Sequence, residues 1–411
     1  MRKLLIALLM VVATEAAVAQ EIVLRHALHG AALEALSTLV LRFNDEQKGR
    51  AKISLQELSG VTDLRQLPHL ALLDDDDARL FFDSRPRFLP LMDVMKAANQ
   101  PFDAGRLLPQ VADAVDDLRG RPQALPMALA LPVLFYNKDA FVKAGLNPEV
   151  PPKTWWETQQ AAGKLYDAGY RCPLTSSRFA WVHLENMSSQ HNEPVVVKSG
   201  RGDRFAFNNL MQVKHLALLA SWQKSFYFHY FGPGQEGDAK FLSGECAMLT
   251  GESSLHSELK RDQRFPVGVA ELPYYEDVFG VRPANVLPDG AALWTLPGKK
   301  KDEYKVAARF IDFLMRSEVQ RDWVRATGFL PMTSSALDAL AAAGVSPAIV
   351  EAARKRLSMP KQADARARSG GSRSRVRAIL NEEVEFVWKN TKPAKQALDT
   401  AMQRANALPV N

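Results

Sequence analysis

Residues 134–157 read LFYNKDAFVKAGLNPEVPPKTWWE, and this stretch contains the clearest structural signals in the chain. The apolar start predicts a buried strand, and the Asn-Lys-Asp turn after it leads into a short amphipathic helix. A Pro-Pro pair then breaks the chain before a second helix, which Thr154 opens. Strands that alternate with helices are typical of an α/β fold. The stretch holds no recognisable catalytic motif.

The composition is that of an ordinary globular protein. A chain of 411 residues, 47% of them hydrophobic, is long enough for two lobes with separate cores. The net charge of +6 is mildly basic, and nucleic-acid binding would need the basic residues on one face. Only ARARSGGSRSRVRA, residues 365–378, has such a concentration. Its glycines and serines favour a mobile solvated loop, with an anion-contacting loop as the alternative.

The first 19 residues have the pattern of a secretory signal peptide. Arg2 and Lys3 precede the apolar run LLIALLMVVA, and residues 17–19 form an A-x-A cleavage site. No later run approaches the ~20 apolar residues that a membrane helix needs. No cysteine lies directly behind the cleavage site, where it could carry a lipid anchor as the first residue of the mature chain. We therefore expect a mature protein that is soluble in the periplasm after cleavage behind Ala19.

Cysteine and histidine usage gives no sign of a metal or cofactor site. The two cysteines, Cys172 and Cys246, can form one disulfide in an oxidising compartment or remain two buried thiols, and the sequence leaves both open. Two cysteines do not make a zinc site, and no histidine pair has metal-binding spacing. The predicted metal and cofactor content is none.

The chain opens as an α/β lobe. Residues 22–28 predict a strand, residues 31–49 an amphipathic helix that Gly49 ends, and residues 51–58 a second strand. A further apolar strand, residues 69–73, ends in four aspartates. Because ligands bind beyond the carboxyl ends of strands in such sheets, this acidic cluster is a candidate site, with a solvated turn as the alternative.

Three crossings between two lobes are predicted. Pro126 and Pro132 suggest an extended first crossing, a second lies near residues 284–290, and FLPMT, residues 329–333, forms a third. The predicted division of the chain is a signal peptide at 1–19, an N-terminal lobe at 20–131 plus 288–328, and a C-terminal lobe at 132–287 plus 329–411.

Two motif matches do not predict chemistry. GPGQEG, residues 232–237, fits G-x-G-x-x-G, but it follows an aromatic run in the second lobe instead of an early strand. Residues 257–260 fit S-x-x-K, but its companion motifs are missing. No G-x-S-x-G nucleophile motif occurs. The seven tryptophans lie in the later part of the chain, and most of them are expected in the core.

Stretches along the chain resemble a known family. FYNKDAFVKAGLNPEVPPKTWWE is similar to the signature of the family-1 extracellular solute-binding proteins of ABC importers. Further stretches resemble, in order and spacing, the members that bind glycerol 3-phosphate: CPLTSSRFAWVHLENMSSQHNEP, FLSGECAMLTGESSL, GAALWTL, AARFIDFL, TGFLPMT and VRAILNEEVEFVW. The resemblance implies a two-lobed α/β periplasmic binding protein fold, type II-like, with three hinge crossings and a ligand cleft between the lobes.

The resemblance also implies ligand contacts. Arg377 would bind a phosphate or carboxylate through its planar fork, and Trp181 would pack on the carbon skeleton. Asp75, with Asp76 as the other possibility, would accept hydroxyl hydrogen bonds. Gly290 would offer a backbone N–H where a side chain would block approach.

This sequence departs from the family pattern at several of those positions. Arg178 stands where the family has tryptophan, Glu252 where it has serine, and Phe329 where it has tyrosine; Ala130 also replaces a serine. We expect Arg178, Glu252, the adjacent Ser253 and Phe329 to line the ligand. A phosphate beside Glu252 is costly in a closed cleft unless Arg178 offsets the carboxylate.

The implied function is that of the extracytoplasmic solute-binding component of an ABC importer. It would capture glycerol 3-phosphate or a glycerophosphodiester and deliver it to permease subunits at the membrane, without catalysis and without a nucleic-acid partner. A sugar or polyol is the alternative ligand. Alternatives from other classes are a periplasmic hydrolase that uses Asp75 and Glu252, and a sensory module that docks on a receptor kinase.

Overall fold

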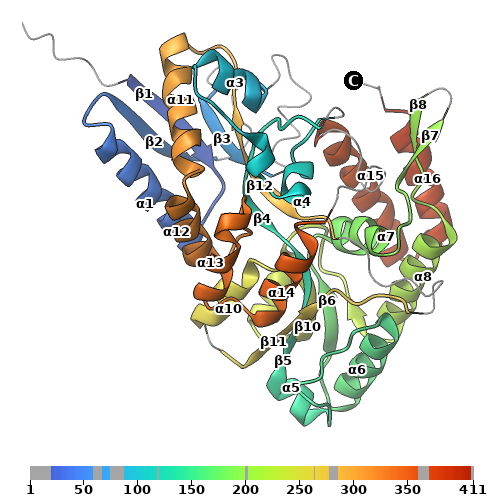
Figure 1. Ribbon diagram of the computed structural model, residues 1–411. Coiled ribbons are helices and arrows are strands. Elements are labelled where there is room, and N and C mark those ends of the chain that lie inside the picture. Colours follow the sequence, from blue (N-terminus) through green and yellow to red (C-terminus); the bar gives the residue numbers. More distant parts are fainter. Residues whose placement is uncertain are drawn as a thin grey trace, which may run out of the picture.

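The computed structural model describes residues 20–58, 67–74, 88–117, 120–199, 202–262, 264–276, 286–359 and 370–408. The expected signal peptide, Asp75 and Asp76 therefore lie outside the described residues. Figure 1 shows an elongated molecule with one sheet in its upper part and a second sheet in its lower part. Within the described ranges, no helix combines the length and apolar character that a bilayer crossing requires.

The first sheet has the strand order β2-β1-β3-β12-β4. Strand β1 (Gln20–His26) pairs in parallel with β2 (Ala51–Glu57) and with β3 (Leu70–Leu73). Strand β12 (Asp289–Thr295) returns from late in the chain and runs antiparallel to β3 and to β4 (Leu125–Ala130). The predicted strand-helix-strand opening with a parallel sheet is confirmed.

Helices cover the first sheet on both faces. Between β1 and β2, helix α1 (Gly30–Glu46) buries Leu36, Leu39, Val40 and Phe43, which recur at helical spacing. Phe43 lies edge-on to Phe310 at 5.1 Å between ring centroids. The other helices of this part are α3 (Leu91–Ala97), α4 (Pro109–Asp113), α11 (Lys301–Leu314) and α12 (Ser317–Thr327), with the 3-10 turn η2 (Ala104–Arg106).

The second sheet has the order β11-β5-β10-β6-β9. Strand β5 (Pro132–Asn137) is antiparallel to β10 (Cys246–Glu252) and β11 (Val267–Glu271). Strand β6 (Cys172–Ser176) is parallel to β10 and to the short edge strand β9 (Phe228–His229). A step of one residue, Leu131, joins β4 of the first sheet to β5 of the second, which begins at Pro132.

The stretch 134–157 folds as its local signals predict. It forms the end of β5, helix α5 (Lys138–Lys143) and the start of helix α6 (Trp155–Asp167). The Asn137 side chain accepts a hydrogen bond of 3.0 Å from the Ala140 N–H and caps α5. Thr154 and Glu157 form a reciprocal capping box at the start of α6.

Cys172 and Cys246 form a disulfide. They face each other in the register of neighbouring strands β6 and β10, with a Cα–Cα distance of 4.5 Å. The choice that the sequence left open is therefore made by strand pairing, which brings together two residues 74 positions apart.

Part of the basic segment 365–378 was interpreted incorrectly as a loop. Helix α15 (Gly370–Trp388) begins inside it, and Arg377 is buried in that helix. Val376, Ile379 and Leu380 lie at helical spacing and join the core, which outweighs the low helix propensity of the glycines and serines. Residues 365–369 lie outside the described residues.

The other elements complete the two parts and the right-hand side of the molecule in Figure 1. They are the π-helix η3 (Ala180–Asn186), α7 (Met187–Gln190), β7 (Val196–Ser199), β8 (Gly202–Phe205), α8 (Leu210–Lys224), α9 (Glu236–Leu242), α10 (Leu255–Asp262), η4 (Ser334–Ala336), α13 (Leu337–Ala342), α14 (Pro347–Arg356) and α16 (Ala394–Asn406).

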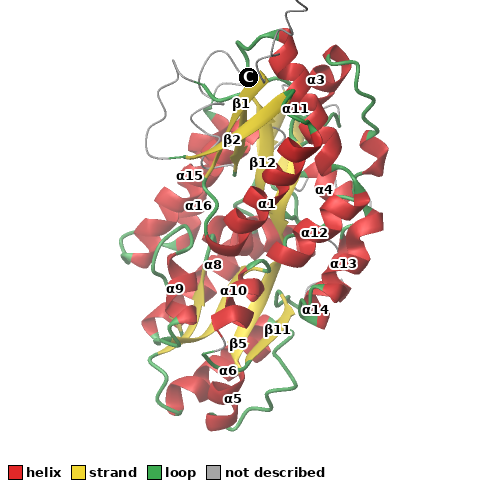
Figure 2. Cartoon of the chain, turned by 90° about the vertical axis from the view of Figure 1, so that its left-hand side faces the viewer, coloured by secondary structure: helices red, strands yellow, loops and turns green. Residues whose placement is uncertain are grey.

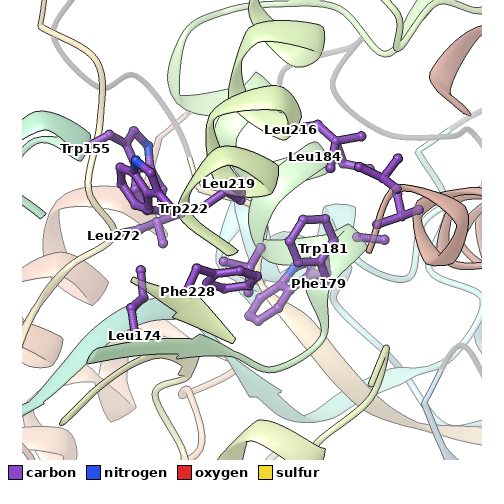
Figure 3. Packing of buried hydrophobic residues seen from close by; sticks show 14 of the residues in the cluster. Trp155, Leu174, Phe179, Trp181, Leu184, Leu216, Leu219, Trp222, Phe228 and Leu272 are labelled. Atoms are coloured by element: carbon purple, nitrogen blue, oxygen red, sulfur yellow. The ribbon is translucent and has the colours of Figure 1, made fainter. Parts of the chain in front are cut away.

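We call the half of the molecule built around the second sheet the second part, and large aromatic residues fill its core (Figure 3). Six of the seven tryptophans are buried, and Trp155, Trp181 and Trp222 are at most 1% exposed, so the expectation that most tryptophans are core residues is confirmed. Trp156 is the exception, with 63% exposure. Trp155 faces the core and Trp156 faces solvent because successive residues of a helix point in different directions.

Two buried histidines form a polar chain inside this core. His183 Nδ1 lies 3.0 Å from His215 Nε2, and His183 Nε2 lies 3.0 Å from the hydroxyls of both Ser176 and Thr250. The His215 Nδ1 atom lies 2.7 Å from the Tyr275 hydroxyl. Burial lowers the pKa of His183 well below its ordinary value, and burial, with His191 nearby, lowers the pKa of His215 to about 3.

We expect His215 to make the protein less stable in mild acid. An unfolded histidine titrates near 6.5, so the stability that neutral His215 contributes is complete above that pH and is lost progressively as pH falls toward the folded pKa. Asp238, whose pKa is raised by burial to about 7, acts in the opposite direction. The prediction is therefore a difference: between pH 7.5 and 5.5, wild type should lose about 1.4 kcal/mol more than His215→Gln. Urea unfolding of both proteins at the two pH values measures it, and equal losses would contradict it.

Candidate functional site

A cleft of about 770 Å³ lies between the two parts of the molecule. One wall consists of the chain after β1, the first turn of α1, the end of β3 and the start of β12; the other consists of Arg178, the segment before α9, the end of β10, and α10. Figure 2 shows α1 above α10 in the middle of the view. The volume of the cleft suits a small-molecule ligand, for which pockets of roughly 300–1,000 Å³ are usual.

Four of the residues predicted from the sequence line this cleft: Arg178, Glu252, Gly290 and Phe329. Trp181, Ser253 and Arg377 are buried and do not line it. Asp75 and Asp76 lie outside the described residues, and Asp74, the first aspartate of the same cluster, lines the cleft at the end of β3. The carboxyl end of β3 therefore opens on the cleft, as expected for ligand sites in α/β sheets.

Five charged side chains form what we call the Asp289 network: Arg178, Glu185, Glu252, Asp289 and Arg377. Arg178 pairs with Glu252 and donates to Asp289 at 2.8 Å. Arg377 also pairs with Asp289, and it donates to both Glu185 oxygens at 2.5 and 2.7 Å. The fork of Arg377 therefore already binds a carboxylate bidentately. The network joins a residue of the first sheet to two arginines of the second part.

Arg178 is held in place from several sides. Its backbone has a φ of 48°, and its N–H donates to the Gly234 carbonyl at 2.6 Å. Its guanidinium lies 5.3 Å from the centre of the Trp181 ring. Burial by itself would lower the pKa of Arg178, but the Glu252 and Asp289 carboxylates outweigh burial and raise it. A bound phosphate would need the negative charge of Glu252 to be neutralised, and Arg178 does this through a direct ion pair.

Trp181 and Ser253 have structural partners behind the cleft. The Trp181 indole N–H donates to the Leu287 carbonyl at 2.8 Å, and the residue is 1% exposed. The Ser253 hydroxyl accepts from the Leu131 N–H at 3.0 Å, and the Ser253 N–H donates to the Leu131 carbonyl at 2.8 Å. Ser253 thus holds the step between the two sheets.

Gly290 lies where no side chain fits. Its φ is +141°, and a Cβ atom there would lie 2.2 Å from the Ala128 carbonyl oxygen. Because β12 pairs with β4 at this point, the close approach of the two backbones requires glycine. Phe329, on the same side of the cleft, stacks on Trp323 with 5.8 Å between ring centroids.

The sequence reasoning missed Asp238, which lines the cleft from α9. Its Oδ1 atom accepts from the Ser177 hydroxyl at 2.5 Å. Burial raises its pKa, and the Glu252 carboxylate adds to the rise. Gln235 of GPGQEG donates to Glu252 at 3.2 Å, so this segment forms part of the cleft wall. No spacing signal in the sequence connects Asp238, Glu185 or Asp289 to a site; the Asp289-Gly290 pair, next to a predicted contact, was the one available hint.

No group of three or more histidine, cysteine, aspartate or glutamate side chains is arranged to hold a metal ion within the described ranges.

The chain matches the profile of the bacterial extracellular solute-binding protein family over residues 51–352. The sn-glycerol-3-phosphate-binding periplasmic protein UgpB of Yersinia enterocolitica is 37% identical over 327 residues, which are 78% of this chain and 74% of that protein. UgpB of Escherichia coli K12 has the same identity and coverage. These relatives are solute-binding proteins of the periplasm and not enzymes, and the expected extracytoplasmic location is confirmed.

Solved structures show the same fold. UgpB from Mycobacterium tuberculosis in complex with glycerophosphocholine superposes with a TM-score of 0.73 at 19% identity, covering 94% of this chain and 98% of that one. Maltose-bound MalE3 of T. maritima also has a TM-score of 0.73, at 19% identity, covering 94% and 99%. The predicted two-lobed α/β fold is confirmed. The chain belongs to the family of bacterial extracellular solute-binding proteins, which supply solutes to ABC importers.

Proposed function

We propose that this protein captures glycerol 3-phosphate or a glycerophosphodiester in the cleft and delivers it, chemically unchanged, to the permease subunits of an ABC importer. The observation that carries the proposal is the 37% identity over 78% of the chain to relatives named for binding sn-glycerol 3-phosphate. The solved structure of a protein with the same name, UgpB from Mycobacterium tuberculosis, contains glycerophosphocholine, which supports a glycerophosphodiester as a second ligand.

The cleft lining supports a small polyhydroxy ligand. Asp74 and Glu252 supply carboxylate oxygens that can accept hydroxyl hydrogen bonds, and Arg178 is a donor beside them. Phe329 and Leu28 supply apolar surface for carbon-bound hydrogens. We propose that Arg178, Glu252, Gly290 and Phe329 contact the solute, while Arg377 orders the network behind them.

The Asp289 network favours one alternative ligand class. Because carboxylates already neutralise Arg178 and Arg377, neither arginine offers uncompensated charge to a phosphate. A neutral sugar or polyol would meet no repulsion from Glu252 in the same cleft. The importer role is the same for either ligand.

We propose that closure moves a lobe of residues 20–131 plus 288–328 against one of residues 132–287 plus 329–411. Support comes from the sheets: β4 and β5 belong to different sheets although one residue separates them, and β12 returns to the first sheet. A hinge of a few extended residues can absorb such a motion. The closed form would present the surface that a permease recognises.

A hydrolase that uses Asp75 and Glu252 receives less support. Glu252 is engaged by Arg178 and by Gln235, so it is not poised as a general acid or nucleophile. A sensory module with the same closure differs only in its membrane partner, so pull-down with a permease or a receptor kinase separates the two roles.

A thermal-shift screen of the mature protein tests the proposal. Glycerol 3-phosphate, glycerophosphodiesters, polyols and oligosaccharides are compared, with calorimetry for each hit and product analysis after incubation. A ligand that binds only the native state stabilises it by mass action and so raises the Tm. At a ligand concentration of 100 times Kd, the free energy of unfolding increases by about 2.7 kcal/mol. We expect a shift with the glycerol phosphates and no product. A shift confined to sugars or polyols would move the specificity, and product formation would overturn the binding role.

A further inference from the structure

Arg261 is a cationic side chain of the cleft that has no partner in the described part of the chain. It lies in the last turn of α10, its side chain is exposed, and it lines the cleft. No ion pair or hydrogen bond joins it to another described group, whereas its neighbour Arg264 pairs with Asp262 at 3.5 Å. Glu258, one turn earlier in α10, also lines the cleft without pairing with Arg261. Arg261 therefore keeps an uncompensated positive charge at this wall.

The Arg261 guanidinium lies against the first turn of α1. A Cβ atom at Gly30, the first residue of that helix, would lie 3.6 and 3.7 Å from its two terminal nitrogens. This end of α1 has no acidic residue in its first turn, and the side chain of the N-cap residue His29 accepts no hydrogen bond from it. A helix N-terminus is itself positive, so a cation there is repelled. Two positive groups from opposite walls therefore lie close together.

An anion between these groups would remove the repulsion. The other arginines near the cleft cannot bind an anion without losing an ion pair. Arg178 is paired with Glu252 and Asp289, and Arg377 is paired with Glu185. Arg261 can turn its fork to two phosphate or carboxylate oxygens at no such cost. Free N–H groups at the start of α1 can donate to the same anion.

We propose that Arg261 binds the anionic group of the solute and thereby determines the preference for a phosphate over a neutral polyol. The inference rests on the proposed function, and it moves the anion contact from Arg377, which was expected from the sequence but does not line the cleft, to Arg261, which does. Because Arg261 belongs to α10 and Gly30 to α1, the bound anion touches both walls. Its binding free energy would then favour the closed arrangement.

Three variants test the inference by calorimetric titration with glycerol 3-phosphate. Arg261→Gln removes the charge, Arg261→Lys keeps the charge without the fork, and Arg264→Gln is a matched control three residues further on and outside the cleft lining. We expect Arg261→Gln to weaken binding by about 10- to 100-fold, as loss of a charge-assisted contact does. Arg261→Lys should lie between Arg261→Gln and wild type, and Arg264→Gln should match wild type.

Two further readouts separate anion binding from a structural role. The affinity of wild type should fall with added salt more steeply than that of Arg261→Gln. The ligand-free Tm of Arg261→Gln should stay close to that of wild type, because the lost charge is repelled by the first turn of α1 but attracted by the last turn of α10.

Three results would contradict the role proposed for Arg261. Wild-type affinity in Arg261→Gln would overturn the Arg261 assignment and leave the proposed function standing. Weaker binding together with a lower ligand-free Tm would show a structural role and would also overturn it. A wild-type protein that binds no glycerol phosphate would overturn the proposed function and, with it, this inference.

Discussion

Replacing Arg377 by Gln is expected to lower the free energy of unfolding by about 3–5 kcal/mol, the usual cost of leaving a buried charge without its partner. Arg377 is 5% exposed, and in the described part of the chain it is the cation that neutralises Glu185, to which it donates two hydrogen bonds. Without it, Glu185 and Asp289 remain buried near Glu252 with Arg178 as the remaining cation of the network. Urea unfolding at pH 7.5 measures the loss.

A double-mutant cycle identifies the cause of the loss. Glu185→Gln combined with Arg377→Gln removes the stranded charge, so the double variant should be more stable than Arg377→Gln alone. Arg354→Gln is the surface control, because Arg354 pairs with an Asp338 side chain that is 90% exposed, and no measurable change is expected there. If Arg377 instead binds the phosphate of the solute, Arg377→Gln will lose affinity while its stability stays near that of wild type.

Replacing Gly290 by Ala should be nearly as disruptive, with a loss of about 2–5 kcal/mol from a strained backbone and an overpacked contact together. The added methyl group would lie 2.2 Å from the Ala128 carbonyl oxygen, a backbone atom that can move only if β4 and β12 separate. Since both strands border the cleft, solute binding should weaken as well. Chemical unfolding and calorimetric titration measure the two effects.

Gly298→Ala is the matched control for backbone strain. Gly298 also has a positive φ, +81°, but a Cβ atom there would meet no atom within 4 Å. It should cost only the roughly 1–2 kcal/mol of a left-handed backbone and should leave solute binding unchanged. Equal losses at Gly290 and Gly298 would contradict the steric explanation.

Signals that act over a few residues were read correctly from the sequence. Asn137 and Thr154 cap α5 and α6 because each side chain reaches an N–H group only three residues away. The apolar spacing of α1 predicted its buried face for the same reason. The basic segment was misread where local and tertiary preferences disagree, since the glycines and serines around residue 370 yield to core packing by Val376 and Leu380.

The candidate site was predicted less completely. The resemblance indicated Arg178, Glu252, Gly290 and Phe329, and these line the cleft. It could not show that Arg377 is neutralised, because Glu185 lies 192 residues away in the sequence and no pattern connects them. Asp238 and Arg261 were missed because neither belongs to a motif, and each acquires its environment from a neighbouring element.

The sequence by itself determined the order of strands and helices, the family and the expected export, since periodicity, caps and ordered motifs are written in neighbouring residues. The tertiary structure alone decided the Cys172–Cys246 bond, the pairing of charges around Asp289, and the meeting of Arg261 with Gly30. The physical reason is distance along the chain. Disulfides, hydrogen bonds and ion pairs act over a few ångströms, and only strand pairing, helix packing and the approach of the two cleft walls bring these residues within that range.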